Sequence, residues 1–255
     1  MKPDSQSSLI FSLFFVSVVG FVPRLQAQTR EPIALVYDGP GACEEDCAVA
    51  AAEIARLEGL TPLFVGPQDI PQPSWSDASA WIQPGGKSST VARSMSAELK
   101  SWIRDFVDQG AAYVGFCAGG FYSTAEVSDR GIAGLGVMPG LTRFFDSFGD
   151  TEVIMTKILW AGVSRQVYWE GGPYFVLPET PVGEAPRAWP LATYENGQIA
   201  AAQALFGRGR VSVSGPHPEA PESWKTYYKL QDSDGPDTDL AQGMLRWALA
   251  LPPRD

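Results

Sequence analysis

The chain has 255 residues, of which 45% are hydrophobic and 19% are charged, a composition that suits a folded globular protein and argues against disorder. Its formal net charge of −10 largely excludes a nucleic-acid-binding protein, which needs basic side chains to neutralise phosphate groups. The 26 glycines and 21 prolines are too many for a helical bundle and indicate frequent turns.

The N-terminus has the pattern of a secretory signal peptide. Lys2 precedes an apolar run at 9–22, and a small-residue exit follows at Ala27. The run is shorter than the ~20 residues that cross a bilayer. We therefore predict residues 1–27 as a signal peptide and 28–255 as a mature domain, located outside the cytoplasm (periplasmic or secreted), with no membrane span after cleavage. The alternative is an uncleaved membrane anchor.

The mature chain begins with alternating strand and helix patterns. Apolar runs predict strands at 33–37, 60–66 and 78–86, amphipathic segments predict helices at 44–59 and 96–110, and another strand at 111–120 runs into a small-residue turn. Strands and helices that alternate at this spacing predict βαβ units and a parallel sheet, that is, an α/β fold.

The second half of the chain has a different pattern. Short turns separate apolar runs that predict strands at 152–159, 165–169, 190–194, 198–206 and 209–214. These suggest antiparallel strands added to the parallel core. A closing helix is expected at 239–251, and no linker divides the mature chain into two domains.

The three cysteines fit an oxidising compartment. Cys43 and Cys47 are four positions apart, which on one helical face places their Cα atoms roughly 6 Å apart, within the range of a disulfide. We expect this bridge rather than a metal site, because the chain has one histidine and no second cysteine pair. Cys117 then remains as a free thiol. No metal and no cofactor is expected.

A glycine-rich element surrounds Cys117. The sequence GFCAGG at 115–120 follows a predicted strand and has the Gly-x-nucleophile-x-Gly pattern of a nucleophile elbow. Its glycines relieve clashes in a tight turn, and the N-terminus of a following helix favours a thiolate. The alternative is a glycine-rich turn around a small buried cysteine.

A second element places an imidazole and a carboxylate together. His217, the only histidine of the chain, follows the predicted strand at 209–214 in a proline-bracketed turn, with Glu219 two residues later. An imidazole can take a proton from a thiol near neutral pH, and a carboxylate orients the imidazole. This predicts a catalytic triad of Cys117, His217 and Glu219. The alternative for His217 is a surface position in a proline turn.

A third element is the turn Gly85-Gly86, which follows Gln83-Pro84 at another strand end. By itself it is only a turn. Next to the elbow, the N–H groups of Gly85 and Gly86 would join that of Ala118 as an oxyanion hole that binds substrate, because functional groups gather where parallel strands end.

These motifs resemble a known superfamily. GFCAGG, the sequence PHPE at 216–219 and the strand ending in PGG are similar to class I glutamine amidotransferase-like proteins, in which a Cys and a His-x-Glu pair form the triad. YDGPGAC at 37–43, GFCAGGFYS at the elbow and RQVYWEGGPYF at 165–175 further resemble the biotin–protein ligase N-terminal domain family.

The resemblance implies a flavodoxin-like three-layer sandwich with a mainly parallel central sheet and added antiparallel strands. It also implies that Cys117, His217 and Glu219 are the triad. One position departs from the family pattern, because Glu170 stands where an Asn commonly precedes the two glycines. The resemblance includes no ligase domain, so it does not imply biotin transfer.

The leading hypothesis for function is a secreted or periplasmic cysteine hydrolase that acts on an amide or related acyl bond of a small-molecule or peptide substrate. Glutamine amidotransferase activity is less favoured, because it would require a partner synthetase that consumes ammonia. The alternative from another class is a non-catalytic module that binds a ligand or peptide. A third interpretation is isomerase- or lyase-like thiol chemistry on a small carbonyl compound.

Tryptophans offer one further clue to a binding site. Five of them fall near predicted loops or strand ends: Trp75, Trp81, Trp160, Trp169 and Trp189. They could line a pocket for rings or sugars, but packing in the core is the simpler explanation. The sequence does not indicate an oligomeric state.

Overall fold

A computed structural model describes residues 32–43, 46–128, 130–146, 153–180, 184–185 and 187–252. Glu31–Asp255 form one compact unit. Residues 1–27 lie outside the described residues, so cleavage after Ala27 and export of the protein stay predictions. No helix in the described part of the chain has the length and apolar character needed to cross a bilayer.

The first half of the chain alternates strands and helices, as predicted. Its elements are β1 Ile33–Tyr37, α1 Cys47–Leu57, β2 Thr61–Val65, the 3₁₀ helix Pro73–Asp77, β3 Ala78–Gln83, α2 Ser88–Ser94, α3 Ala97–Asp108, β4 Ala112–Phe116 and α4 Ala118–Ser123. The strand predicted at 78–86 ends at Gln83, and helix α2 was not predicted.

The second half contains mostly strands. Its elements are β5 Leu141–Phe144, β6 Val153–Trp160, β7 Val163–Glu170, β8 Pro173–Val176, β9 Ala188–Tyr194, β10 Ile199–Phe206, β11 Gly209–Ser214, α5 Glu222–Tyr227 and α6 Thr238–Ala248. Strands β5 and β8 and helix α5 were not predicted.

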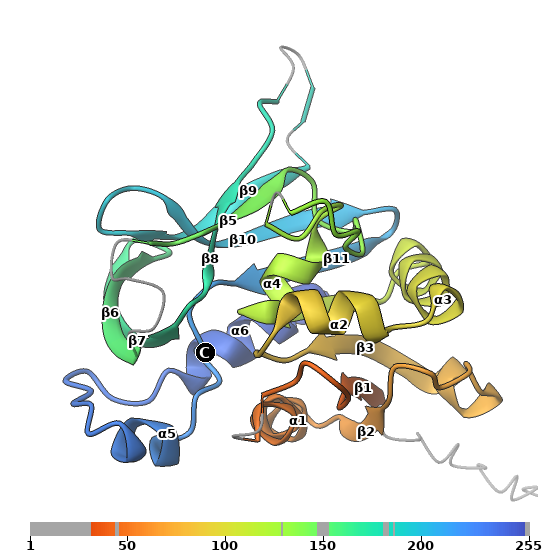
Figure 1. Ribbon diagram of the computed structural model, residues 1–255, viewed down its shortest axis with the longest axis horizontal. Coiled ribbons are helices and arrows are strands. Elements are labelled where there is room, and N and C mark those ends of the chain that lie inside the picture. The colour runs from red at the N-terminus through yellow and green to blue at the C-terminus, as the bar shows by residue number, and fades with distance from the viewer. Residues whose placement is uncertain are drawn as a thin grey trace, which may run out of the picture. The chain divides into compact units, whose positions relative to one another are not determined.

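One mixed sheet has the main strand order β2-β1-β3-β4-β11-β10-β9-β6-β7, and β8 and β5 join it beside this path, with β8 on β10 and β5 on β8 (Figure 1). The pairs from β2 to β11 are parallel, and the pairs from β11 to β7 are antiparallel. The predicted parallel core with added antiparallel strands is therefore confirmed. Strand β11 pairs antiparallel with β10, as expected, and on its other side it also pairs parallel with β4. This pairing brings the carboxyl ends of β3, β4 and β11 to one edge of the sheet.

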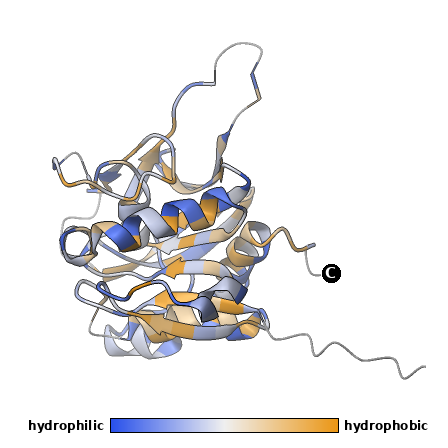
Figure 2. Cartoon of the chain, turned by 90° about the vertical axis from the view of Figure 1, so that its right-hand side faces the viewer, coloured by the Kyte–Doolittle hydropathy of each residue, from blue (hydrophilic) through white to orange (hydrophobic). Residues whose placement is uncertain are grey.

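Helices cover both faces of the parallel part of the sheet, as the alternation of its side chains requires. Val36 and Ile82 pack in one buried cluster with α1 and α6, while Leu35 and Trp81 point to the other face and pack with α2, α3 and α4. Figure 2 shows hydrophobic residues concentrated along the strands between the helices. The predicted three-layer sandwich is confirmed.

Helix α3 shows how the local sequence sets these layers. The Ser96 side chain accepts a hydrogen bond from the Leu99 N–H at 3.1 Å, which satisfies one of the donors left unpaired at a helix start. Leu99, Ile103 and Val107, spaced four residues apart, are the buried residues of the helix. This spacing places them on one face.

Candidate functional site

The elbow holds Cys117 at the carboxyl end of β4. Its backbone angles, φ 45° and ψ −99°, are rare for any residue except glycine and are maintained only where neighbours fix them. The Cys117 N–H donates to the Ser214 carbonyl at 2.8 Å, which ties the elbow to the end of β11. A Cβ on Gly119 would lie 2.2 Å from the Gln83 carbonyl oxygen, so glycine is required where the turn approaches β3.

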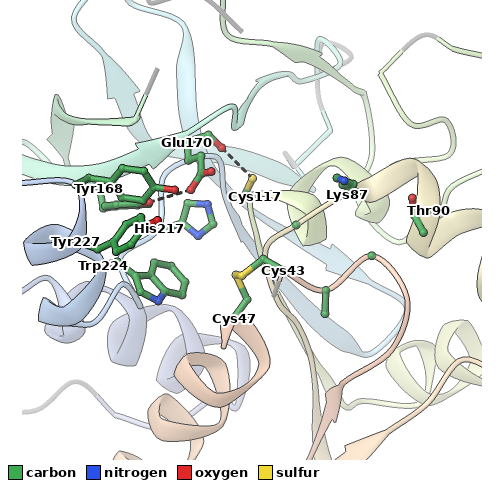
Figure 3. Close-up of a pocket in the computed structure, with 14 residues that line it drawn as sticks. Cys43, Cys47, Lys87, Thr90, Cys117, Tyr168, Glu170, His217, Trp224 and Tyr227 are labelled. Carbon is green, nitrogen blue, oxygen red and sulfur yellow. Dashed lines mark hydrogen bonds between the residues drawn. A yellow bond between two sulfur atoms is a disulfide. The ribbon is translucent and has the colours of Figure 1, made fainter. Parts of the chain in front are cut away.

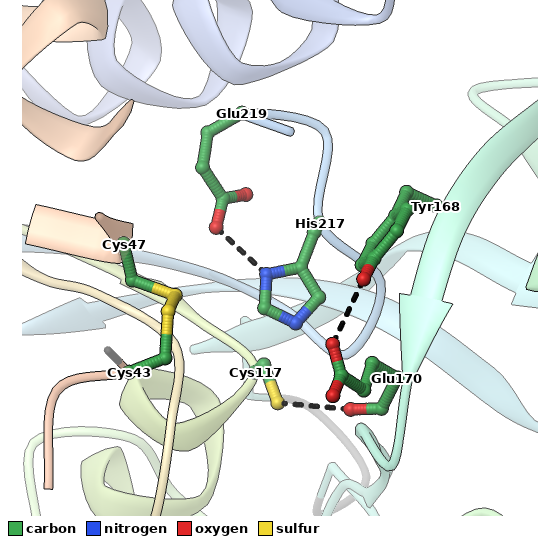
Figure 4. The surroundings of a disulfide bond; sticks show 7 residues. All are labelled: Cys43, Cys47, Cys117, Tyr168, Glu170, His217 and Glu219. Atoms are coloured by element: carbon green, nitrogen blue, oxygen red, sulfur yellow. Dashed lines mark hydrogen bonds and ion pairs between the residues drawn. A yellow bond between two sulfur atoms is a disulfide. The ribbon is translucent and has the colours of Figure 1, made fainter. Parts of the chain in front are cut away.

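The imidazole of His217 enters the same site from the turn after β11 (Figure 4). Its Nδ1 lies 2.9 Å from Glu219 Oε1, and its backbone N–H donates to the Tyr168 carbonyl at 2.8 Å. Cys117 and His217 are each 4% exposed and Glu219 is 2% exposed. The structure therefore brings the three predicted residues together, with their side chains almost completely buried.

Charges around His217 favour its protonated form. Burial alone lowers the pKa of His217, but the charges of Glu219 and Cys117 and the hydrogen bonds to both residues outweigh burial, so its pKa lies well above the ordinary value. The geometry and the charges both suit transfer of a proton between Cys117 and His217.

The glycine turn after β3 lies against the histidine. A Cβ on Gly85 would lie 2.4 Å from His217 Cε1 and 3.3 Å from Cys47 Sγ, so the absent side chain makes room for the imidazole. Gly86 lines the pocket, and Ala118 begins α4 with no exposed surface. The oxyanion role of these N–H groups stays a prediction.

Cys43 and Cys47 form a disulfide with their Cα atoms 5.4 Å apart, and Cys117 is a free cysteine. Both bridged cysteines line the pocket. Within the described residues, no group of three or more His, Cys, Asp or Glu side chains could hold a metal ion.

A pocket of about 540 Å³ opens in front of Cys117 (Figure 3). One side comes from the loop after β1, the disulfide and the start of α2, including Lys87 and Thr90. The other side comes from β7, the histidine turn and α5. The residues on that side are Tyr168, Glu170, His217, Trp224, Tyr227 and Tyr228.

Glu170 lies beside the thiol at the end of β7. Its carbonyl oxygen lies 3.6 Å from Cys117 Sγ and accepts a hydrogen bond when the thiol is protonated. The Tyr168 hydroxyl donates to Glu170 Oε2 at 2.8 Å. Gly172 packs so closely on the turn before His217 that a Cβ would lie 2.1 Å from the Gly215 carbonyl oxygen. This segment belongs to the motif at 165–175 that resembles the ligase N-terminal family, but the sequence indicated no role for it.

The sequence did not predict the aromatic side chains that form one wall of the pocket. Trp224, Tyr227 and Tyr228 come from α5 and its C-terminal end, a helix too short for its pattern to be recognised in the sequence. Trp224 lies with its ring centroid 5.7 Å from that of His217. None of the five tryptophans considered from the sequence is among the described residues that line this pocket. Four of them are buried in the hydrophobic clusters: Trp75, Trp81, Trp160 and Trp169.

An ion-pair network holds the segment after α5 against β7. The Arg165 guanidinium lies 2.9 Å from Asp237 Oδ1 and 2.9 Å from Asp239 Oδ2. Lys225, on α5, pairs with Asp232 of the same segment. Because β7 and α5 both supply pocket walls, this network stabilises the side of the pocket that faces Lys87.

We expect the substitution Arg165→Met to lower the free energy of unfolding by about 2 kcal/mol, because it leaves the buried Asp237 without its partner. Burial already raises the pKa of Asp237 to about 7, so protonation of the carboxyl offsets part of the loss. The side chain of Asp237 is only 2% exposed. Chemical denaturation measures the change. The matched control is Arg56→Met, which removes an exposed pair with Glu53 and should cost less than about 1 kcal/mol. Equal losses in the two variants would show that the Arg165 network has no special weight.

Comparisons with known proteins identify the relatives of the chain. Residues 33–136 match the family model described as "Biotin-protein ligase, N terminal". A biotin–protein ligase of Schizosaccharomyces pombe is 27% identical over 213 residues, which cover 72% of this chain and 33% of the relative. The chain thus spans about a third of that relative's length.

Solved structures show the same fold. A glutamine amidotransferase is similar with a TM-score of 0.57 and 20% identity, over 76% of this chain and 96% of that one. PurLQS from Thermotoga maritima is similar with a TM-score of 0.58 and 18% identity, over 84% and 98%. The resemblance to the ligase N-terminal family and to amidotransferase-like folds is confirmed.

The prediction of a secreted cysteine hydrolase is wrong. The family match and the curated relative both indicate a protein like the N-terminal part of a biotin–protein ligase, and a ligase conflicts with hydrolysis as the reaction. The matches also give no support to a hydrolytic cysteine nucleophile or to secretion. They do not clearly favour the alternative of a non-catalytic binding module.

Proposed function

We propose that this protein transfers an acyl group from a small molecule to an amine, with the acyl group held for a time as a thioester on Cys117. The observation that carries this proposal is the burial of the reactive groups at the foot of an aromatic-walled pocket. The Cys117 thiol, the His217 imidazole and the Glu219 carboxylate are all almost closed to solvent. Burial leaves little surface at which water can reach an acyl group on Cys117, and a substrate that fills the pocket would displace the water there and protect the acyl intermediate from hydrolysis.

The ligase relative supports transfer as the type of reaction. Its name describes the joining of a small molecule, biotin, to a protein, which is group transfer to an acceptor other than water. This chain spans only a third of that relative, so only the class of chemistry is carried over. The proposed donor is a small molecule with an activated carbonyl group, and the acceptor is an amine.

The side chains of the site divide the reaction into two balanced steps. The Cys117 thiolate forms a C–S bond with the carbonyl carbon, the bond to the leaving group breaks, and the protonated His217 gives its proton to that group. An amine then forms a C–N bond with the same carbon, the C–S bond breaks, and His217 receives the proton lost by the amine. Glu219 orients His217 and stabilises its charged form in both steps.

The N–H groups of Gly85, Gly86 and Ala118 are proposed to bind the carbonyl oxygen while it carries negative charge. A donor held in this position before the reaction stabilises the tetrahedral intermediate. Gly86 lines the pocket, and Ala118 follows the reactive cysteine directly. These positions are consistent with that role.

The test is acylation by a p-nitrophenyl ester of a short carboxylic acid, followed by mass spectrometry of the intact protein and its peptides. We expect one acyl adduct, on the peptide that contains Cys117. Addition of an alkylamine should release the acyl group as the amide rather than as the free acid. The variant Cys117→Ser should carry no thioester.

Two results would overturn the proposal. An adduct that forms equally well in Cys117→Ser would place the reaction elsewhere on the protein. Release of the free acid at the same rate with and without the amine would show that water is the acceptor.

A further inference from the structure

The carboxylate of Glu170 lies on the pocket side of β7 and has no role in the acyl transfer proposed above. Glu170 lines the pocket, and its carbonyl oxygen lies 3.6 Å from Cys117 Sγ. Within the described part of the chain, its carboxylate has the Tyr168 hydroxyl as its partner and forms no ion pair with a basic side chain. Its negative charge is therefore available to a ligand.

Aromatic rings surround the same side of the pocket. Tyr168, Trp224, Tyr227 and Tyr228 line it with Glu170, and the ring centroids of Tyr168 and Trp224 lie 5.5 Å apart. A cation is attracted to the face of an aromatic ring, and rings gathered around one point recognise ammonium groups. A carboxylate beside such rings adds a charged hydrogen-bond acceptor.

The opposite side of the pocket has the opposite charge. Lys87 lies across the Cys117 thiol from Glu170, at the start of α2 (Figure 3). An ammonium group that enters the pocket is repelled from that side and attracted to the β7 side. A cationic ligand should therefore bind with its charged group toward β7.

We propose that Glu170, Tyr168 and the aromatic residues of α5 form a subsite for an alkylammonium group. In the proposed function, which this inference deepens, the subsite selects amine-bearing molecules as acceptors in their ammonium form. The Glu170 carboxylate accepts one proton from the ammonium group and later releases it to solvent. The neutral amine then attacks the thioester on Cys117 and gives its second proton to His217. The binding of the ammonium group itself requires no acyl donor, so it can be measured separately.

The test compares the binding of n-butylammonium with that of the neutral 1-butanol. Ligand-observed NMR measures both affinities on the full chain without an acyl donor. We expect the wild type to prefer n-butylammonium. Glu170→Gln should weaken the binding of n-butylammonium about two- to fivefold, because the amide oxygen of Gln still accepts a hydrogen bond but the negative charge of an exposed carboxylate is lost. Binding of 1-butanol should change by less than about twofold.

Two further variants make the comparison specific. Tyr227 is 77% exposed, so Tyr227→Leu removes one ring without disturbing the core and should weaken n-butylammonium about two- to fivefold. Glu195→Gln is the matched charge control. That carboxylate lies outside the pocket-lining residues and pairs with the exposed Lys157, so its loss should leave binding unchanged.

Equal affinity of the wild type for n-butylammonium and 1-butanol would overturn the inference, as would unchanged binding in Glu170→Gln. Either result, together with acylation of Cys117 and release to an amine, would leave the proposed function in place. Binding of n-butylammonium that depends on Glu170, without any thioester on Cys117, would support the subsite and reject acyl transfer.

Discussion

The substitution His217→Ala should slow alkylation of Cys117 by iodoacetamide about 100-fold at pH 6 and change it little above pH 9. At pH 6 a free thiol with a pKa of about 8.5 is almost entirely protonated, whereas the wild type has an imidazolium that favours the thiolate. Glu219 and Cys117 raise the pKa of His217 well above its ordinary value although burial lowers it. Rates measured across pH 5–10, with peptide mapping of the product, give the two profiles.

The direction of the pH effect follows from that raised pKa. Below it His217 is protonated and attracts the thiolate, and as the pH rises through it the attraction is lost. Because the chain has a single histidine, no other imidazole can replace it or obscure its titration. Glu219→Gln is the intermediate control, since it keeps the hydrogen-bond shape but removes the charge. Identical profiles for the wild type and His217→Ala would show that His217 does not activate the thiol.

The sequence was a good guide to elements with a strong periodic pattern. The strand predicted at 33–37 is β1 with the same bounds, and the helix predicted at 96–110 contains α3. The missed elements α2, α5, β5 and β8 are all short, and in short segments helical and strand periods cannot be distinguished. Their positions depend on tertiary packing rather than on local pattern.

The candidate site divides in the same way. Cys117, His217 and Glu219 belong to compact motifs at strand ends, and a parallel sheet brings such ends together, so their meeting could be predicted. Glu170 could not be placed beside them from the sequence. In the sheet, β7 lies at the far end of the order from β2, yet the Tyr168 carbonyl on β7 accepts a hydrogen bond from the His217 N–H.

Long-range curvature of the sheet accounts for that contact. The antiparallel strands between β11 and β7 must bend back toward the end of β11 for it to form, and twist accumulates along a sheet from strand to strand. No local motif encodes such a return. The pocket walls supplied by β7 and α5 therefore appear only once the strands are paired.

The substitution Gly85→Ala should lower the rate at which Cys117 is acylated about 100-fold at neutral pH while the protein stays folded. The added Cβ would lie 2.4 Å from His217 Cε1 and 3.2 Å from its Nδ1, distances too short for carbon and nitrogen atoms in contact. The ring is held at Nδ1 by Glu219 and through its backbone by Tyr168. It must therefore shift by about 1 Å, and a displacement of that size in a reactive group costs about 100-fold in rate.

A second glycine separates this steric effect from the general effect of adding a methyl group. Gly243 lies within α6 and has no atom within 4 Å of an added Cβ, so Gly243→Ala should leave acylation unchanged and stabilise the protein by about 0.5–1 kcal/mol through helix propensity. Acylation by the p-nitrophenyl ester and thermal unfolding are measured on both variants. Retained reactivity in Gly85→Ala would mean that the position of His217 does not limit the reaction. Loss of reactivity with an unchanged unfolding temperature would place the effect at residue 85, through its contact with the imidazole or through the N–H group that it is proposed to supply to the carbonyl oxygen.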